Sequence, residues 1–238
     1  MITVKYNYDP IDRETIDSKR HYCLPDGSKV PSVTTILSAT SSEGKRLALA
    51  QWRKRVGEKK AQEITTEAAS RGTRMHAYLE HFMLNDVMKP LPGNTFAHPS
   101  WFMAAKVILN GLCHVDEFWG AEVPVYYSGL YAGTTDCLGI WKGRPAIIDF
   151  KQSNKLKKLE YIEDYFLQTV AYGTAHNNMH STNINTGVIM ICVKPEVDNM
   201  GSLTTEPVYQ EFTIDGTTWN QYEELWIKKV EEYYHQCC

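Results

Sequence analysis

The stretch "GTTDCLGIWKGRPAIIDFKQS", residues 133–153, decides the fold. Two β-like runs flank Lys142 and Gly143, a pair typical of a two-residue turn between antiparallel strands. That turn fixes the register, and the register places Asp136 directly opposite Asp149 on one face, with β-carbons about 5 Å apart. A slip of one residue would separate the acids. The sequence therefore predicts a hairpin that brings two carboxylates together.

The paired acids raise a problem of charge. At an effective dielectric constant of about 20, two carboxylates about 5 Å apart repel by roughly 3 kcal/mol, which pushes one towards protonation. Lys151 shares the face of Asp149, while Phe150 points the other way. A divalent cation offsets the repulsion better than one lysine, and carboxylates suit Mg²⁺ or Mn²⁺. The alternative is an exposed Asp-Lys pair, but the apolar run "AIIDFK" indicates a central strand and favours a metal site.

The composition is that of a globular protein. The chain has 238 residues, of which 43% are hydrophobic, enough for a buried core. It contains no apolar run of about 18 residues that could span a membrane. Six cysteines without a CxxC pair argue against a zinc or iron-sulfur site. The first residues resemble neither a signal peptide nor a transit peptide, so we expect an intracellular location without a targeting leader.

Charge is distributed unevenly along the chain. Residues 45–60 carry seven Lys or Arg and one Glu, whereas residues 195–238 carry nine Asp or Glu and two Lys. A basic segment on a protein of net charge -3 indicates either contact with a polyanion or an ordinary solvated helix face.

Apolar spacing predicts the order of the elements. Residues 1–30 lack clear strand patterns. The predicted helices are 43–85, with candidate breaks at Gly57 and Gly72, then 101–111, 156–176 and 218–234. The predicted strands are 115–127, 131–141, 145–151, 186–194 and 207–215. This order predicts an α/β fold with a mixed central β-sheet flanked by helices and a helical N-terminal part.

Three motifs carry a resemblance to a known family. "GTTD" and "IIDFK", with twelve residues between Asp136 and Asp149, resemble the active-site hairpin of the PD-(D/E)xK nucleases. "RGTRMH" (71–76) and "QTVAY" (168–172) resemble the histidine and QxxxY motifs of the RecB-like branch, in the same order. With "VPSVTTIL" (30–37) and "ALAQWRKRVGEKK" (48–60), the chain resembles the mitochondrial genome-maintenance exonuclease family and its phage and bacterial relatives over most of residues 30–235.

The resemblance implies the fold, the cofactor and the site. It implies a restriction-endonuclease-like core at 113–238 within a single nuclease domain, 1–238, whose first part, 1–112, is mainly helical. The implied metal ligands for Mg²⁺ or Mn²⁺ are His76, Asp136, Asp149 and the carbonyl of Phe150. The implied catalytic residues are Asp136, Asp149, Lys151, His76, Glu122, Gln168 and Tyr172, with Lys151 orienting the attacking water. The implied DNA contacts are Ser32, Thr34, Arg46, Arg53, Lys54, Arg71, Arg74 and Ser153.

Alternatives stay open for several of these residues. Glu122 would bind the metal or would be a strand-edge carboxylate. Gln168 and Tyr172 share one helix face and would bind the scissile phosphate or support the lysine. Ser32 and Thr34 would contact a phosphate or cap a helix.

Two further assignments concern aromatic and histidine side chains. Trp52 would stack on a base, but its spacing with apolar neighbours favours the core. His176 and His180 lie at a predicted helix end, and we expect them to be solvated.

The expected function is that of a metal-dependent deoxyribonuclease, an exonuclease that prefers single-stranded DNA with a free end. The alternatives are a structure-specific or restriction-type endonuclease of the same fold and a non-catalytic DNA-binding protein. The expected source is a bacterium or a phage-infected host, with the protein in the cytoplasm. DNA is the expected partner; no helicase motif is present, no membrane contact is expected, and the sequence names no protein partner.

Overall fold

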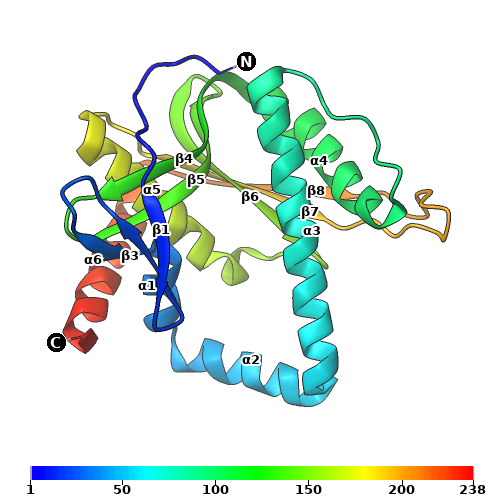
Figure 1. Cartoon of the computed structure of the whole chain (residues 1–238), viewed down its shortest axis with the longest axis horizontal. Helices are drawn as coiled ribbons and strands as arrows, with labels where there is room; N and C mark the ends of the chain where they lie inside the picture. Colours follow the sequence, from blue (N-terminus) through cyan, green and yellow to red (C-terminus); the bar gives the residue numbers. More distant parts are fainter. Residues whose placement is uncertain (1, 238) are drawn as a thin grey trace.

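A five-stranded mixed sheet forms the centre of the molecule (Figure 1). The computed structural model describes residues 2–237. The strands follow the order β4-β5-β6-β7-β8, in which β6 and β7 are parallel and the other neighbours are antiparallel. Their bounds are β4 Val115–Tyr127, β5 Tyr131–Trp141, β6 Arg144–Ser153, β7 Thr186–Val193 and β8 Val208–Asp215. The predicted α/β fold with a mixed central sheet is confirmed.

The hairpin of β5 and β6 has the predicted register. The paired residues run from Trp141 with Arg144 to Cys137 with Ile148. Lys142 and Gly143 both have positive φ, 47° and 78°, as a two-residue turn of the type that matches strand twist requires. A short local turn therefore sets the geometry of the strands that carry the acids.

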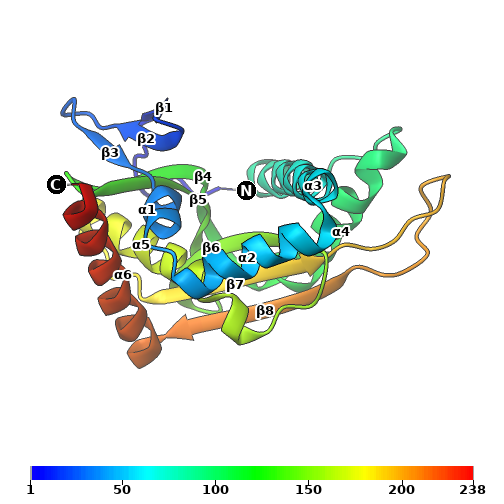
Figure 2. The same ribbon diagram turned by 90° about the horizontal axis from the view of Figure 1, so that it is seen from below.

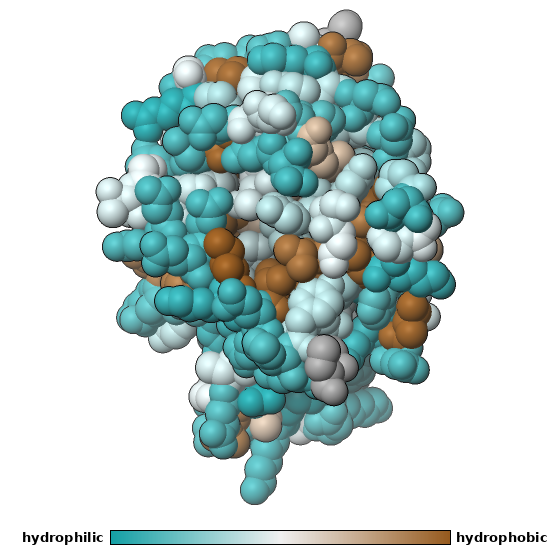
Figure 3. All heavy atoms as spheres, turned by 90° about the vertical axis from the view of Figure 1, so that its left-hand side faces the viewer, coloured by the Kyte–Doolittle hydropathy of each residue, from teal (hydrophilic) through white to brown (hydrophobic). Residues whose placement is uncertain are grey.

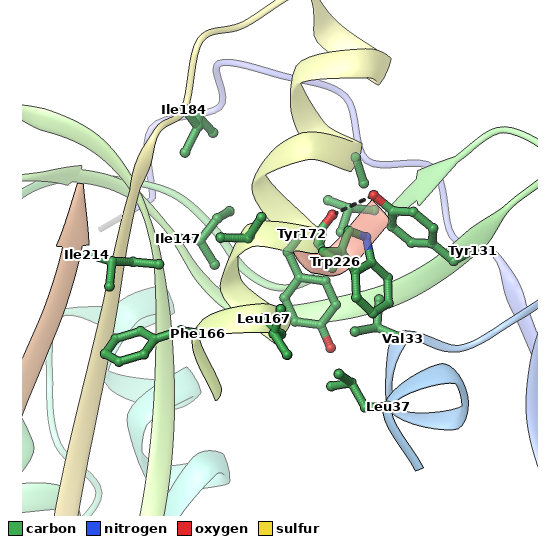
Figure 4. Packing of buried hydrophobic residues seen from close by; sticks show 14 of the residues in the cluster. Val33, Leu37, Tyr131, Ile147, Phe166, Leu167, Tyr172, Ile184, Ile214 and Trp226 are labelled. Atoms are coloured by element: carbon green, nitrogen blue, oxygen red, sulfur yellow. Dashed lines mark hydrogen bonds between the residues drawn. The ribbon is translucent and has the colours of Figure 1, made fainter. Parts of the chain in front are cut away.

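Helices cover both faces of the sheet (Figure 2). Their bounds are α3 Glu58–Asn85, α4 His98–Asn110, α5 Glu163–His180 and α6 Gly216–Cys237. One core joins the sheet to α5 and α6 and includes Ile147, Phe166 and Trp226 (Figure 4). The second core joins the opposite face to α3 and α4 and includes Met75 and Phe150. Alternate residues of β6 enter opposite cores, so the strand is buried on both faces.

The N-terminal part differs from the prediction in one respect. Residues 1–30 were expected to lack strands, but the structure contains a three-stranded antiparallel sheet. Its strands are β1 Asp12–Ile16, β2 Lys19–Cys23 and β3 Lys29–Pro31. This sheet leaves one face exposed, so its strands carry polar residues at alternate positions and give little apolar signal. Helices α1, Val33–Ala39, and α2, Glu43–Val56, follow and lead into α3.

Two helix details also differ. The helix expected from residue 156 begins at Glu163, after a short 3₁₀ turn at Leu159–Tyr161. Of the two candidate breaks, Gly57 has a φ of 87° and separates α2 from α3, whereas Gly72 lies inside an unbroken helix. Glycine costs only about 1 kcal/mol in a helix, so its presence alone does not predict a break.

No helix within residues 2–237 is long and apolar enough to cross a bilayer. The side that presents β1–β3 is largely hydrophilic, with hydrophobic residues in small separate patches (Figure 3).

The end of α5 contains a buried histidine that the sequence analysis placed in solvent. His176 is 0% exposed and contacts the rings of Tyr6, Tyr8 and His180. Its Nδ1 lies 2.8 Å from the hydroxyl of Thr182, and its Nε2 lies 3.0 Å from that of Tyr8. The N-terminal segment covers this helix end, and no local pattern predicts that long-range contact.

Thr182 also determines the state of this ring. Its hydroxyl proton is donated to Asn177, so it accepts from Nδ1–H, which leaves Nε2 to accept from Tyr8. Burial, with a smaller effect of His180, lowers the pKa of His176 to about 3. The native state therefore holds a neutral imidazole.

This burial predicts acid sensitivity. The unfolded chain binds a proton at His176 below about pH 6.5 and the folded chain does not, so stability is lost as pH falls from 6.5 towards 3. We expect wild type to lose up to about 1.4 kcal/mol more per pH unit below 6.5 than His176→Gln. Urea unfolding at pH 7.5, 6 and 5 measures the difference. His235→Gln, at an exposed position, is the control; equal slopes for wild type and His176→Gln would contradict the assignment.

Candidate active site

A cavity of about 310 Å³ holds most of the predicted site residues. Its walls come from the β1–β2 hairpin, α1, α3, α5 and the three strands β4, β5 and β6. The predicted residues that line it are Ser32, Thr34, His76, Glu122, Asp136, Lys151, Gln168 and Tyr172. Asp149 is 1% exposed and does not line the cavity, but it contacts the ammonium of Lys151. Side chains far apart in sequence therefore meet at one place.

Three of these residues form a group of metal-ligating atoms. One donor atom each from His76, Glu122 and Asp136 lies within 4.8 Å of the others. The Nδ1 atom of His76 lies 3.4 Å from Asp136 Oδ1 and 3.6 Å from Glu122 Oε1. An imidazole nitrogen that faces two carboxylates is a chemically suitable start for a divalent cation site.

Glu122 takes this position through an unusual backbone. Its φ is 51°, the left-handed region, although it lies inside strand β4. The register of β4 and β5 is unchanged across this position, since Ala121 pairs with Cys137 and Val123 with Thr135, so Glu122 lies opposite Asp136. Such a conformation costs of order 1 kcal/mol or more for a residue other than glycine. The strand therefore carries local strain at the residue whose carboxylate faces His76.

Backbone groups of Phe150 position the other two ligands. The N–H of Phe150 donates to Asp136 Oδ2 at 2.7 Å, and its carbonyl accepts from His76 Nε2 at 3.0 Å. A carbonyl can only accept, so Nε2 carries the proton and Nδ1 is the nitrogen that faces the acids. Phe150 was expected to be a metal ligand through this same carbonyl; in the structure the carbonyl orients the histidine.

Asp149 and Lys151 form a close ion pair beside this group. Lys151 Nζ lies 2.5 Å from Asp149 Oδ2, and the ammonium also lies over the ring of Tyr165 at 5.1 Å. Both carboxylate oxygens of Asp149 are buried and lack a hydrogen bond of regular geometry to any group within residues 2–237, although Oδ2 contacts the ammonium of Lys151. A buried carboxylate in this state has free acceptor capacity.

The pKa values of Asp149 and Asp136 are shifted in opposite directions, as expected for two neighbouring acids. Burial raises the pKa of Asp149, with a further contribution from Asp136 that Lys151 opposes. Burial acts in the same direction on Asp136, but His76 and Lys151 outweigh it and hold that pKa below its ordinary value. Burial alone would lower the pKa of His76, but the opposite effect of Asp136 and Glu122 is larger and raises this pKa to about 10. Without a bound cation, a proton on His76 therefore partly compensates the acids.

Lys151 is held by a chain of hydrogen bonds from α5. Its ammonium donates to Gln168 Oε1 at 3.2 Å, and Gln168 Nε2 donates to the hydroxyl of Tyr172 at 2.8 Å. Gly133 leaves room for the tyrosine ring, since a β-carbon there would lie 2.4 Å from Tyr172 Cε1. Of the two alternatives for Gln168 and Tyr172, the geometry shows contact with the lysine.

Several predicted DNA contacts lie away from this cavity. Arg71 is 3% exposed, and its guanidinium is taken up by Glu67, Gln152 and Asn154. These hydrogen bonds join α3 to β6, and the role of Arg71 as a DNA contact stays a prediction. Arg74 lines a larger cavity of about 690 Å³ near Arg71, in which no cluster of metal-ligating residues within 2–237 occurs.

Serine residues of the predicted set act on the local backbone. Ser153 exchanges hydrogen bonds with the backbone of Lys155 and does not line the site. Ser32 caps α1 by accepting from the N–H of Thr35 at 3.0 Å, and it is buried. Thr34 is exposed and lines the cavity, which leaves its hydroxyl accessible to a ligand.

The basic helix α2 is exposed along its length. None of its residues is buried, so the expected core position of Trp52 is wrong; its side chain is partly exposed. Arg53 pairs with Glu58, and Lys45 pairs with Glu163 and Asp164. The remaining cations of α2, Arg46, Lys54 and Arg55, have no ion pair within residues 2–237. Figure 1 shows α2 spanning the distance between α1 and α3, apart from the sheet.

Sequence reasoning missed the β1–β2 wall of the cavity. Arg13, Arg20 and Tyr22 line it alongside the acids. The only signal was the alternation of polar and apolar residues in "DRETI" and "KRHYC", which is too short to predict a hairpin.

Comparisons with known proteins find one recurrent name. The chain is 28% identical to human mitochondrial genome maintenance exonuclease 1 over 214 residues, which cover 86% of this chain and 58% of the relative. It is 28% identical to the protein of that name from Xenopus tropicalis over 241 residues, which cover 94% of this chain and 64% of the relative. The chain thus spans about three fifths of these relatives' length. The resemblance that the motifs predicted is confirmed.

The other comparisons add less. No family model matches the chain. A solved structure of a candidate exonuclease from Eubacterium rectale is 11% identical, with a TM-score of 0.48, and the match covers 70% of this chain and 65% of that one.

The strain at Glu122 leads to a stability prediction. We expect Glu122→Gly to keep or raise the free energy of unfolding by up to about 1 kcal/mol in EDTA, because glycine adopts φ of 51° without strain. Glu117→Gly, on the same strand at a position without positive φ, is the control and should lose about 0.5–1 kcal/mol. Urea unfolding measures both; an equal loss in the two variants would show that Glu122 is unstrained.

Proposed function

We propose that this protein is a metal-dependent DNA exonuclease that acts on single-stranded DNA with a free end. The observation that carries the proposal is the meeting of His76, Glu122 and Asp136 within 4.8 Å, next to the buried pair of Asp149 and Lys151. Carboxylates and an imidazole that can hold a cation, with an ammonium beside them, suit metal-assisted hydrolysis of a phosphodiester.

The donor set fits a divalent cation. His76 Nδ1, Glu122 and Asp136 would hold Mg²⁺ or Mn²⁺, and the unsatisfied oxygens of Asp149 would accept it as well. The cation would take the place of the proton on His76, as expected for a ligand that must lose its proton on binding. When bound, the ion lowers the pKa of a water molecule and neutralises charge on the phosphate.

Lys151 supplies a proton donor rather than a base. Burial opposes its charge, but Asp149 and Asp136 outweigh burial and hold its pKa above the ordinary value. A protonated ammonium orients the attacking water through a lone pair of the water, and it stabilises negative charge that develops on the phosphate. Asp149 and Gln168 fix the ammonium on two sides, so its orientation is set before substrate binds.

Access to the site supports a single-stranded substrate. The catalytic groups lie in a cavity between the β1–β2 hairpin and α3, and a scissile phosphate must enter it to reach Asp136 and Lys151. A flexible single strand enters such a cavity more easily than a duplex, whose persistence length is about 50 nm. The names of the similar proteins support exonuclease action, and α2 provides unpaired cations for the strand. A DNA substrate agrees with an intracellular location.

Removal of site residues provides the first test. In Mg²⁺ or Mn²⁺, we expect Asp136→Asn, Asp149→Asn and Lys151→Ala each to lower degradation of end-labelled single-stranded DNA by at least about 100-fold, because the first two weaken cation binding and the third removes the ammonium that would stabilise charge on the phosphate. Lys142→Ala, at the exposed turn of the same hairpin, is the matched control and should keep full activity. Full activity in Lys151→Ala would contradict the assignment.

Circular and linear single-stranded DNA distinguish an exonuclease from an endonuclease. Circular single-stranded DNA should resist digestion, while linear strands with 5′ or 3′ label should be degraded. Cleavage of the circle would identify an endonuclease of the same fold. If the protein binds DNA tightly but cuts it with none of the three ions Mg²⁺, Mn²⁺ and Ca²⁺, it is a non-catalytic DNA-binding protein.

The hydrogen-bond chain behind Lys151 predicts a graded effect. Tyr172→Phe removes the acceptor that orients the Gln168 amide, and we expect kcat to fall by about 10-fold with KM unchanged. Gly133→Ala should have a similar effect, because its β-carbon would displace the tyrosine ring. A rise in KM with kcat unchanged would show instead that Tyr172 contacts the substrate.

A further inference from the structure

The β1–β2 hairpin presents two arginines to the cavity. Arg13 pairs with Tyr22 and Thr15 pairs with Arg20, so all four share one face of this small sheet. Arg13, Arg20 and Tyr22 line the same cavity as His76, Glu122 and Asp136. Strands β2 and β3 contact β5, and the small sheet lies over β4 and β5 (Figures 1 and 2). The two arginines therefore line a cavity whose other walls include His76 of α3.

The hairpin is fixed to the catalytic strands. The hydroxyl of Tyr22 lies 3.2 Å from that of Thr134, two residues before Asp136 on β5. Tyr22, Leu24 and Val30 form a separate small core with Ala132 of β5. This packing gives the hairpin a defined place relative to the site.

The backbone of Arg20 adds a second anchor. Its carbonyl accepts from the N–H of Ser32 and from the hydroxyl of Thr35, both at 2.9 Å. The start of α1 therefore holds the strand that carries Arg20, while the guanidinium remains exposed.

The charges of the two arginines are not used within the protein. Neither forms an ion pair or a side-chain hydrogen bond with any group in residues 2–237, and both side chains are exposed. By contrast, Lys29 on the opposite face of the same sheet pairs with Glu14 at 2.8 Å. Two unpaired guanidinium groups at the mouth of a phosphodiesterase-type site suit a polyanionic ligand with regularly spaced phosphates.

We propose that Arg13 and Arg20 bind backbone phosphates of the DNA strand next to the scissile phosphate and thereby position the strand over Asp136 and Lys151. This inference rests on the proposed function and adds a binding surface to it. The two side chains lie on opposite strands of the hairpin at diagonal positions, so they can contact successive phosphates. Contacts to phosphate fix the position of the strand without reading its sequence.

Salt dependence of binding measures phosphate contacts directly. Binding of a fluorescent oligothymidine to the full chain in EDTA, where it is not cut, should weaken linearly in log K against log salt, by a slope of about 0.7 per contact on single strands. We expect Arg13→Gln and Arg20→Gln each to reduce the slope by about 0.7, and the double variant by about 1.4. Arg13→Lys and Arg20→Lys, which keep the charge, should retain most of the slope. Lys29→Ala is the matched control and should keep the wild-type slope.

Each outcome decides the inference. Reduced slopes in the Gln variants, with Lys29→Ala unchanged and thermal unfolding of all variants equal to wild type, support it. Wild-type slopes in the double variant overturn it, while nuclease activity of the wild type leaves the proposed function intact. Equal reductions in Lys29→Ala also overturn it, because they indicate a general effect of net charge. A wild type that neither binds nor cuts DNA contradicts the proposed function and the inference together.

Discussion

The structure depends on the compensation of negative charge at one end of the β5–β6 hairpin. Glu122, Asp136 and Asp149 approach one another closely enough that their carboxylates would repel by several kcal/mol without nearby positive charge. His76 and Lys151 supply that charge, one from α3 and one from β6. A protein selected for stability alone gains nothing from this arrangement, since paired hydrophobic residues would pack there at lower cost.

The rest of the fold holds these charges in place. Packing of α5 on the sheet places Gln168 and Tyr172 next to Lys151. Packing of α3 on the other face places His76 next to the carbonyl of Phe150. The small core of β1–β3 brings a third wall against β5. Three separate hydrophobic clusters therefore surround one polar cavity. Their packing offsets the cost of the strained backbone at Glu122.

The hairpin was predictable from sequence because its determinants are local. A two-residue turn fixes the register, so the pairing of the two acids follows from residues 133–153 alone. The β1–β2 hairpin was not predictable, since one face is solvated and its position depends on long-range packing of Tyr22 against β5. The contacts of Arg71 were not predictable either. Its guanidinium is buried and bonded to Gln152, far away in sequence, a contact that only tertiary packing reveals.

Anomalous diffraction from crystals grown in Mn²⁺ measures whether these residues bind a divalent cation. We expect one or two strong peaks at the Mn²⁺ absorption edge, in contact with His76 Nδ1, Glu122 and Asp136 and within reach of Asp149. Saturating Mn²⁺ with no anomalous density between these side chains, while His76 stays bonded to Phe150, would contradict this expectation.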